Sequence, residues 1–214
     1  MAGSGLITLA AIAAFVLTRV QPAVSTFTVP SYSEVLKKLN GWEQQYPDYV
    51  EVWDAQSQYG LGSAGTCQVD GTQQPCKQWF IRITNEKTLA MELDRPQVFF
   101  SGNLHGNEQV GPPVLMELIS RMLFATTEAS KPGGKVYKPE SSTAWLSRLV
   151  DTRVTVFLVV SNPIGHEQRV RSEVSLDPNR DFAHDVQPSA CMNTIVARAV
   201  NEVFRAHLFQ SGIT

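Results

Sequence analysis

Two stretches of the chain alternate apolar and polar residues, and two others are almost wholly apolar. Tyr49 to Trp53 and Trp79 to Ile83 alternate, as half-buried antiparallel strands do. Gln97 to Phe100 (QVFF) and Val154 to Val160 (VTVFLVV) are short continuous apolar runs, which suit central strands covered on both faces. The pattern therefore predicts a sheet in which two half-buried strands accompany two buried ones, with a hairpin-like start.

Three segments space their apolar residues as amphipathic helices do. The first runs from Ser33 to Tyr46 and has Ser31 or Ser33 as a possible N-cap. The second is Val114 to Phe124, and the third extends from Asn193 to about His207. Each has one apolar face, so we expect each helix to pack on the sheet.

The order of these elements predicts the fold class. Strands alternate with helices, which is the pattern of an α/β domain; we expect a mixed, largely parallel central sheet with helices on both faces. Thr126 to Thr143 is rich in Ser, Thr, Pro and Gly, and is predicted to be a surface loop. Leu208 to Thr214 (LFQSGIT) begins another strand. We therefore expect the fold to be truncated before its C-terminal strands.

Composition changes this picture mainly at the N-terminus. The 214 residues, 43% of them hydrophobic, suffice for one domain, and the net charge of −2 gives no footprint for nucleic acid. Leu6 to Leu17 is apolar but shorter than the roughly 20 residues that span a bilayer. Ala23 and Ser25 then suit a cleavage site, so residues 1–25 are predicted to be a signal peptide and 26–214 the domain. We expect a protein that is secreted or resides in the lumen of the secretory pathway or vacuole; it would meet a membrane only if the first segment stayed uncleaved.

The cysteines agree with an oxidising compartment. Cys67 and Cys76 bracket a polar, turn-rich segment with Gly71 and Pro75, which a disulfide could close into a small loop. Two unpaired thiols are the alternative. Cys191 is left over.

Polar loops follow both buried strands of the predicted sheet. Ser101 to Glu108 (SGNLHGNE) follows the first, and Ser161 to Phe182 follows the second. Ligands bind beyond the carboxyl ends of strands in such sheets, so we expect the two loops to share a cleft. His105 and Glu108 are three residues apart, with Gly106 allowing a sharp turn, and could ligate one zinc ion. A polar loop at a strand end is the alternative.

The second loop carries cationic groups. Asn179 and Arg180 offer a planar array of donors that suits a carboxylate, and Arg169 or Arg171 could stabilise an oxyanion. The alternative is that these arginines form ordinary surface ion pairs. Four carboxylates nearby could serve as partners: Glu167, Glu173, Asp177 and Asp181.

Three motifs in this order resemble a known family. GNLHGNE, SNPIGHEQRVR and DPNRDF are similar to segments of the zinc carboxypeptidases of the carboxypeptidase A and carboxypeptidase E type. The resemblance runs from about Ser31 to Thr214. Ile164 stands where the family usually has Asp, and Pro178 where it usually has Leu. Both are scaffold positions, so we expect little effect on chemistry.

The resemblance implies a cofactor and a role for each site residue. It implies Zn²⁺ held by His105 and Glu108, and a peptide or protein C-terminus as substrate. It further implies that Asn179 and Arg180 bind the substrate's terminal carboxylate and that Arg171, in preference to Arg169, polarises the scissile carbonyl.

The family's second zinc histidine and its Glu general base would lie beyond residue 214. We therefore expect the N-terminal part of a metallocarboxypeptidase catalytic domain, inactive by itself. Two other functions remain open at this point. One is a deacylase or amidase of the same fold acting on N-acyl amino acids, and the other is a non-catalytic secreted binding module.

Overall fold

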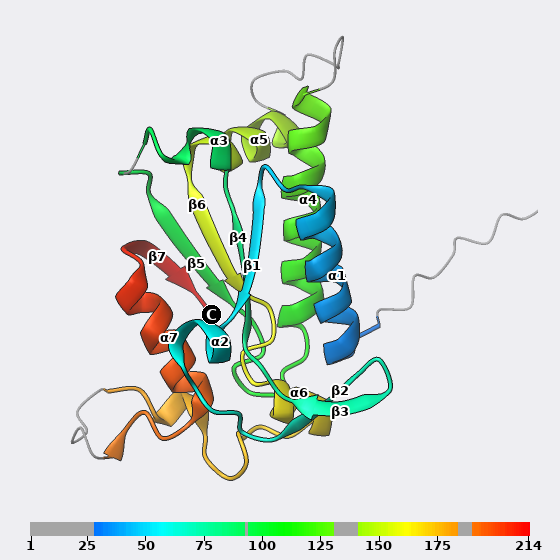
Figure 1. Ribbon diagram of the computed structural model, residues 1–214, viewed down its shortest axis with the longest axis vertical. Helices are drawn as coiled ribbons and strands as arrows, with labels where there is room; N and C mark the ends of the chain where they lie inside the picture. Colours follow the sequence, from blue (N-terminus) through cyan, green and yellow to red (C-terminus); the bar gives the residue numbers. More distant parts are fainter. Residues whose placement is uncertain (1–27, 93, 131–140, 184–189) are drawn as a thin grey trace, which may run out of the picture.

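The computed structural model describes residues 28–214, apart from 93, 131–140 and 184–189. Within these ranges a sheet runs in the order β1-β4-β6-β5-β7, with helices beside it (Figure 1). Strand β4 is antiparallel to β1 and β6, whereas β5 is parallel to β6 and β7. The predicted α/β fold with a mixed sheet is confirmed. The strands are β1 (Val50–Asp54), β4 (Trp79–Ile83), β5 (Gln97–Ser101), β6 (Val154–Leu158) and β7 (Phe209–Ile213).

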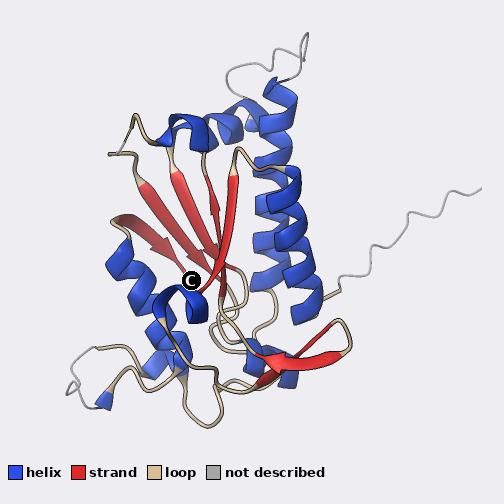
Figure 2. Ribbon diagram, in the orientation of Figure 1, coloured by secondary structure: helices blue, strands red, loops and turns tan. Residues whose placement is uncertain are grey.

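Helices cover both faces of this sheet, and Figure 2 shows the strands flanked by them. Side chains of β6 alternate between two cores: Phe157 packs with one set of helices, and Val156 and Leu158 with the other. All three are fully buried, as a continuous apolar run predicts. The first core includes α1 (Tyr32–Gln45), α4 (Gly111–Ser130) and α5 (Ser142–Thr152); the second includes residues of α2 (Ala55–Tyr59) and α7 (Ile195–Ala206).

Helix α1 begins where the sequence predicts. The Ser31 hydroxyl accepts a hydrogen bond from the Glu34 N–H at 3.2 Å, and the Glu34 carboxylate accepts one from the Ser31 N–H at 2.7 Å. This reciprocal capping box satisfies two backbone donors that a helix start leaves without intrahelical partners. Leu39 and Trp42 are buried on the inner face. Ser31 is therefore the N-cap, and Ser33 is not.

The prediction of a surface loop from Thr126 to Thr143 is wrong at both ends. Helix α4 continues to Ser130, and α5 begins at Ser142; residues 131–140 lie outside the described part. The serines that suggested a loop include a helix cap, since the Ser141 hydroxyl accepts from the Ala144 N–H at 3.2 Å. Packing of α5 on α4 and the full burial of Val150 then stabilise a helix that was not predicted.

The cysteine segment forms a hairpin of its own. Strands β2 (Thr66–Val69) and β3 (Thr72–Pro75) are antiparallel, and the predicted Cys67–Cys76 disulfide is confirmed. Both sulfur-bearing residues are 1% exposed, in the same core as α1. Strand β2 also contacts α6 (Pro163–Gln168). The predicted signal peptide lies outside the described residues.

Strands β5 and β6 bring the polar loops together. They are parallel neighbours with Ser101 opposite Leu158, so both loops leave the same edge of the sheet. The second loop contains α6 and the short η1 (Pro178–Arg180); the remaining helix, α3 (Glu86–Leu89), precedes β5. None of the helices in the described ranges combines the length and apolar composition that crossing a membrane requires.

Candidate functional site

The loop after β5 brings His105 and Glu108 together, as their spacing predicts. His105 is 5% exposed, whereas Glu108 lies at the surface. His105 Nδ1 is 3.1 Å from Glu108 Oε2. The two groups therefore converge closely enough to bind one cation, with neutral imidazole and carboxylate as donors of the kind zinc prefers.

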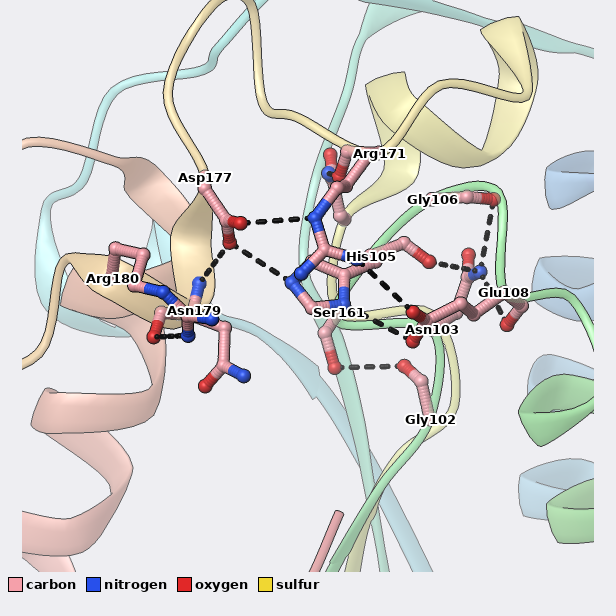
Figure 3. Close-up of polar contacts among 11 residues, drawn as sticks. Gly102, Asn103, His105, Gly106, Glu108, Ser161, Arg171, Asp177, Asn179 and Arg180 are labelled. Carbon is pink, nitrogen blue, oxygen red and sulfur yellow. Dashed lines mark hydrogen bonds and ion pairs between the residues drawn. The ribbon is translucent and has the colours of Figure 1, made fainter.

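Asp177 fixes the opposite side of the same imidazole. Its Oδ1 lies 2.9 Å from His105 Nε2, across the gap between the two loops (Figure 3). A histidine that binds a metal usually donates its other ring N–H to such a carboxylate. In the tautomer with its proton on Nε2, His105 donates to Asp177, and a cation between Nδ1 and Glu108 would use the Nδ1 lone pair. The imidazole is therefore oriented as a metal ligand needs to be.

The sequence marks Asp177 only as a candidate ion-pair partner of the nearby arginines. Its place beside His105 could not be read from the sequence, because the two residues lie 72 positions apart on different loops. Partial burial raises the pKa of Asp177, but hydrogen bonds from Arg171, His105 and the Asn179 N–H outweigh this and lower the pKa to about 2. Asp177 is therefore ionised near neutral pH, as an acceptor for the His105 N–H must be.

Arg171 lies between the two loops. Its Nη1 is 3.3 Å from Glu108 Oε1, and its Nε is 3.0 Å from Asp177 Oδ2. The expected ion pairing with Asp177 is thus present, and it bridges the loops. Arg169, by contrast, is the exposed C-cap of α6. Of the two arginines, Arg171 is the one in contact with a candidate ligand.

The predicted carboxylate-binding pair is only partly brought to the cleft. His105, Glu108 and Asn179 line one cleft of about 690 Å³. Arg180 does not line it, and its Nη1 donates to the Asn179 carbonyl at 3.1 Å. Asn179 therefore lines the same cleft as the candidate ligands, whereas Arg180 does not.

Gly106 lies inside the turn between the two candidate ligands, because the Glu108 N–H donates to the His105 carbonyl at 3.0 Å. A Cβ on Gly106 would collide with the backbone of Gly165 in α6, and the residue with left-handed backbone is Asn103, at φ 60°. Both departures from the family pattern are accommodated: Ile164 packs in the core and Pro178 is buried at the start of η1. The turn expected at Gly106 is therefore present, and close packing on Gly165 is the reason that this position has no side chain.

The donors present fit a zinc ion but do not complete its site. His105 Nδ1 and Glu108 supply one nitrogen and one oxygen, and Asp177 orients the first. A catalytic zinc ion takes three protein ligands. Within the described ranges, no group of three His, Cys, Asp or Glu residues could hold a metal. The residues that the structure describes thus offer two candidate ligands and one carboxylate that could orient the first.

Two buried carboxylates hold the second loop on the start of α7. Glu173 accepts hydrogen bonds from the N–H groups of Ile195 and Val196, at 2.6 and 3.2 Å. Asp181 accepts from the Thr194 N–H at 2.6 Å and from its hydroxyl at 2.8 Å. Burial raises the pKa of Glu173 despite these donors, whereas for Asp181 the hydrogen bonds outweigh burial and lower the pKa.

Replacing Asp181 with Ala is expected to destabilise the fold by about 1–3 kcal/mol at neutral pH, since charge-assisted hydrogen bonds to buried donors are lost. The pKa of Asp181 is lower in the folded chain than its ordinary value of 3.8, so its charge stabilises the fold fully at pH values above 3.8. This contribution disappears as the pH falls through the lowered pKa. The free energies of unfolding of D181A and wild type, measured with urea, should therefore converge in acid. Asp151→Ala, at an exposed position, is the control. An equal difference at every pH would contradict this account.

Comparison with known proteins agrees with the motifs and the fold. The family model described as zinc carboxypeptidase matches residues 67–200. No curated protein sequence matches the chain. Carboxypeptidase A from Helicoverpa armigera has a similar structure, with a TM-score of 0.59 at 16% identity, covering 84% of this chain and 43% of its own.

Two further solved structures are similar. Thrombin activatable fibrinolysis inhibitor gives a TM-score of 0.60 at 14% identity, over 84% of this chain and 44% of that one. A metallo-carboxypeptidase from Burkholderia cenocepacia gives 0.59 at 12% identity, over 86% and 40%. This chain spans less than half the length of these structures, and the likeness shows the fold. Because the family model covers more than half of the chain and the fold agrees, the chain belongs to the zinc carboxypeptidase family.

Proposed function

We propose that the chain is part of a metallocarboxypeptidase that removes single residues from the C-termini of peptides or proteins. The observation that carries this proposal is the orientation of His105, held by Asp177 on one nitrogen and facing Glu108 with the other. Membership of the zinc carboxypeptidase family supports the same function.

In this proposal His105 and Glu108 hold Zn²⁺, and Asp177 keeps the proton of His105 on Nε2. When bound, zinc lowers the pKa of water so that it becomes a nucleophile near neutral pH. The Glu108 carboxylate would then exchange its contact with Arg171 for the metal. Arg171 would be released to donate to the scissile carbonyl oxygen, where a positioned donor is worth about 10²–10³ in rate.

Asn179 and Arg180 are proposed to bind the terminal carboxylate of the substrate. Asn179 already lines the cleft. Arg180 would need to exchange its hydrogen bond with the Asn179 carbonyl for the substrate, and a bidentate guanidinium–carboxylate pair is stronger than the single bond to a neutral carbonyl that it replaces. A third ligand and a general base are not among the residues assigned. We propose that sequence following residue 214 in the gene supplies them.

The protein is further proposed to enter the secretory pathway. The buried Cys67–Cys76 disulfide supports this, because such bridges persist in oxidising compartments. The apolar segment near the N-terminus is consistent with the same route.

The test compares the 214-residue chain with a product that includes any coding sequence following it. Release of C-terminal amino acids from N-blocked dipeptides is measured before and after treatment with a chelator, and again after zinc is restored. We expect the longer product to be active, to lose activity on chelation and to regain it with zinc. The shorter chain should be slower by at least about 10²-fold, because no general base is assigned among its described residues.

The other outcomes separate the alternatives. Cleavage of N-acyl amino acids without release from dipeptides would assign the deacylase or amidase function instead. Activity that is indifferent to chelation would rule out the proposed mechanism. Failure of both products to bind zinc would favour a non-catalytic binding module.

A further inference from the structure

His166 is a buried histidine that the proposed mechanism does not use. It lies on α6 and is 3% exposed. Its Nδ1 is 2.8 Å from Asn103 Oδ1, and its Nε2 is 2.9 Å from the Pro30 carbonyl oxygen. Both partner atoms are oxygen acceptors, and each ring nitrogen lies within hydrogen-bond distance of one of them. Neither is left to bind a metal.

Asn103 connects His166 to the metal-binding loop. Its Nδ2 lies 3.0 Å from each of three carbonyl oxygens, those of His105, Gly106 and Glu108. An amide nitrogen can only donate, so these carbonyls fix the amide orientation and turn Oδ1 toward His166. Asn103 also has left-handed backbone, which asparagine tolerates better than most residues.

The backbone of the metal-binding loop packs directly on α6, beside the contact between His166 and Asn103. Gly106 lies against Gly165, the residue before His166, with no space for a Cβ between them. Gln109 Nε2 donates to the His166 carbonyl at 3.2 Å. The loop that carries both candidate ligands therefore contacts α6 at two points. Pro30, at the other end of the link, directly precedes the N-cap of α1.

We propose that His166 is a positioning residue for the metal-binding loop. By donating to Asn103 it holds the amide that gathers the His105, Gly106 and Glu108 carbonyls, and so sets the separation of the two ligands. Through the contact of its Nε2 with the Pro30 carbonyl oxygen, it couples that loop to the segment before α1. The metal-related part rests on the proposed function, whereas the link itself can be measured without metal.

The test uses His166→Phe, which keeps a planar ring without donors, and Asn103→Gly, which keeps the left-handed backbone but loses the amide. In the metal-free chain, NMR of the Asn103 side-chain NH₂ should show exchange at least about 10-fold faster in H166F, because hydrogen-bonded groups exchange through local opening. Zinc affinity of the longer product, measured by competition with a chromophoric chelator, should fall about 10-fold in each variant, the low end of the effect of residues that support a metal ligand. The double variant should bind zinc no more weakly than N103G, since both act through one link.

The matched control is His207→Phe. His207 is also hydrogen-bonded, to Gln97 Oε1 at 2.9 Å, but it follows α7, away from this loop. It should leave the Asn103 signals unchanged. The proposal would be overturned if the exchange rate of the Asn103 side-chain NH₂ were unchanged in H166F. It would also be overturned if the losses in zinc affinity of the two single variants added in the double variant. If H166F does not fold, His166→Leu, which also lacks a donor, takes its place in the same measurements. If the longer wild-type product binds no zinc, the proposed function fails, and Asn103 exchange still decides whether His166 holds the loop.

Discussion

Replacing Glu108 with glutamine is expected to abolish zinc-dependent hydrolysis by the longer product and to weaken zinc binding by at least about 100-fold. Even residues that only support a metal ligand contribute about 10–100-fold to affinity, so a direct ligand should contribute no less. A neutral amide oxygen is a poor substitute for a carboxylate on zinc. Glu108 is also one of two donors in the described part of the site, and its loss leaves His105 alone. Chelator competition measures the affinity, and dipeptide hydrolysis the activity.

Glu117→Gln is the matched control for this variant. Glu117 is an exposed carboxylate on α4 and is also paired with an arginine, Arg121, at 2.7 Å. It makes the same chemical change outside the cleft, and should leave zinc affinity unaltered. If E108Q bound zinc as tightly as wild type, Glu108 would not be a ligand. The proposed use of His105 with Glu108 would then have to be abandoned.

Removing the Cys67–Cys76 disulfide, in the double variant C67A/C76A, is expected to lower the free energy of unfolding by about 2–4 kcal/mol. The bridge restricts the unfolded chain, and its sulfur atoms also belong to the core shared with α1. The hairpin that it closes contacts α6, where Ile164 packs beside Gly65. Chemical denaturation followed by tryptophan fluorescence measures the loss.

Two comparisons isolate the bridge as the cause. Wild type in the presence of a thiol reductant should approach the stability of C67A/C76A, whereas the double variant should not respond to reductant. Cys191→Ala controls for removal of a cysteine that is outside this bridge. A double variant as stable as oxidised wild type would show that hairpin packing alone holds this region.

Regular elements were predictable where the apolar pattern was long and locally consistent. Helix α1, the four strands β1, β4, β5 and β6, and helix α7 were all found close to the predicted positions. Helix α5 was missed, because serine and threonine are common both in loops and at helix caps. Its identity as a helix depends on contacts with α4, which lies earlier in the chain.

The candidate site was predictable in its residues more than in its contacts. His105 and Glu108 could be paired from their spacing, because three residues bring two side chains together locally. Asp177 could not be assigned to His105, since 72 residues separate them. The same holds for His166, whose partners Asn103 and Pro30 lie 63 and 136 residues away.

The sequence by itself determined the local facts: the amphipathic faces, the buried strands, the cysteine pair and the residue types at the strand ends. The tertiary structure decided which of those polar groups meet. Parallel pairing of β5 and β6 sets both loops at one edge of the sheet, and there Asp177 and Arg171 reach His105 and Glu108. Hydrophobic periodicity is read within one element, whereas a hydrogen bond between loops depends on the register of the strands that carry them.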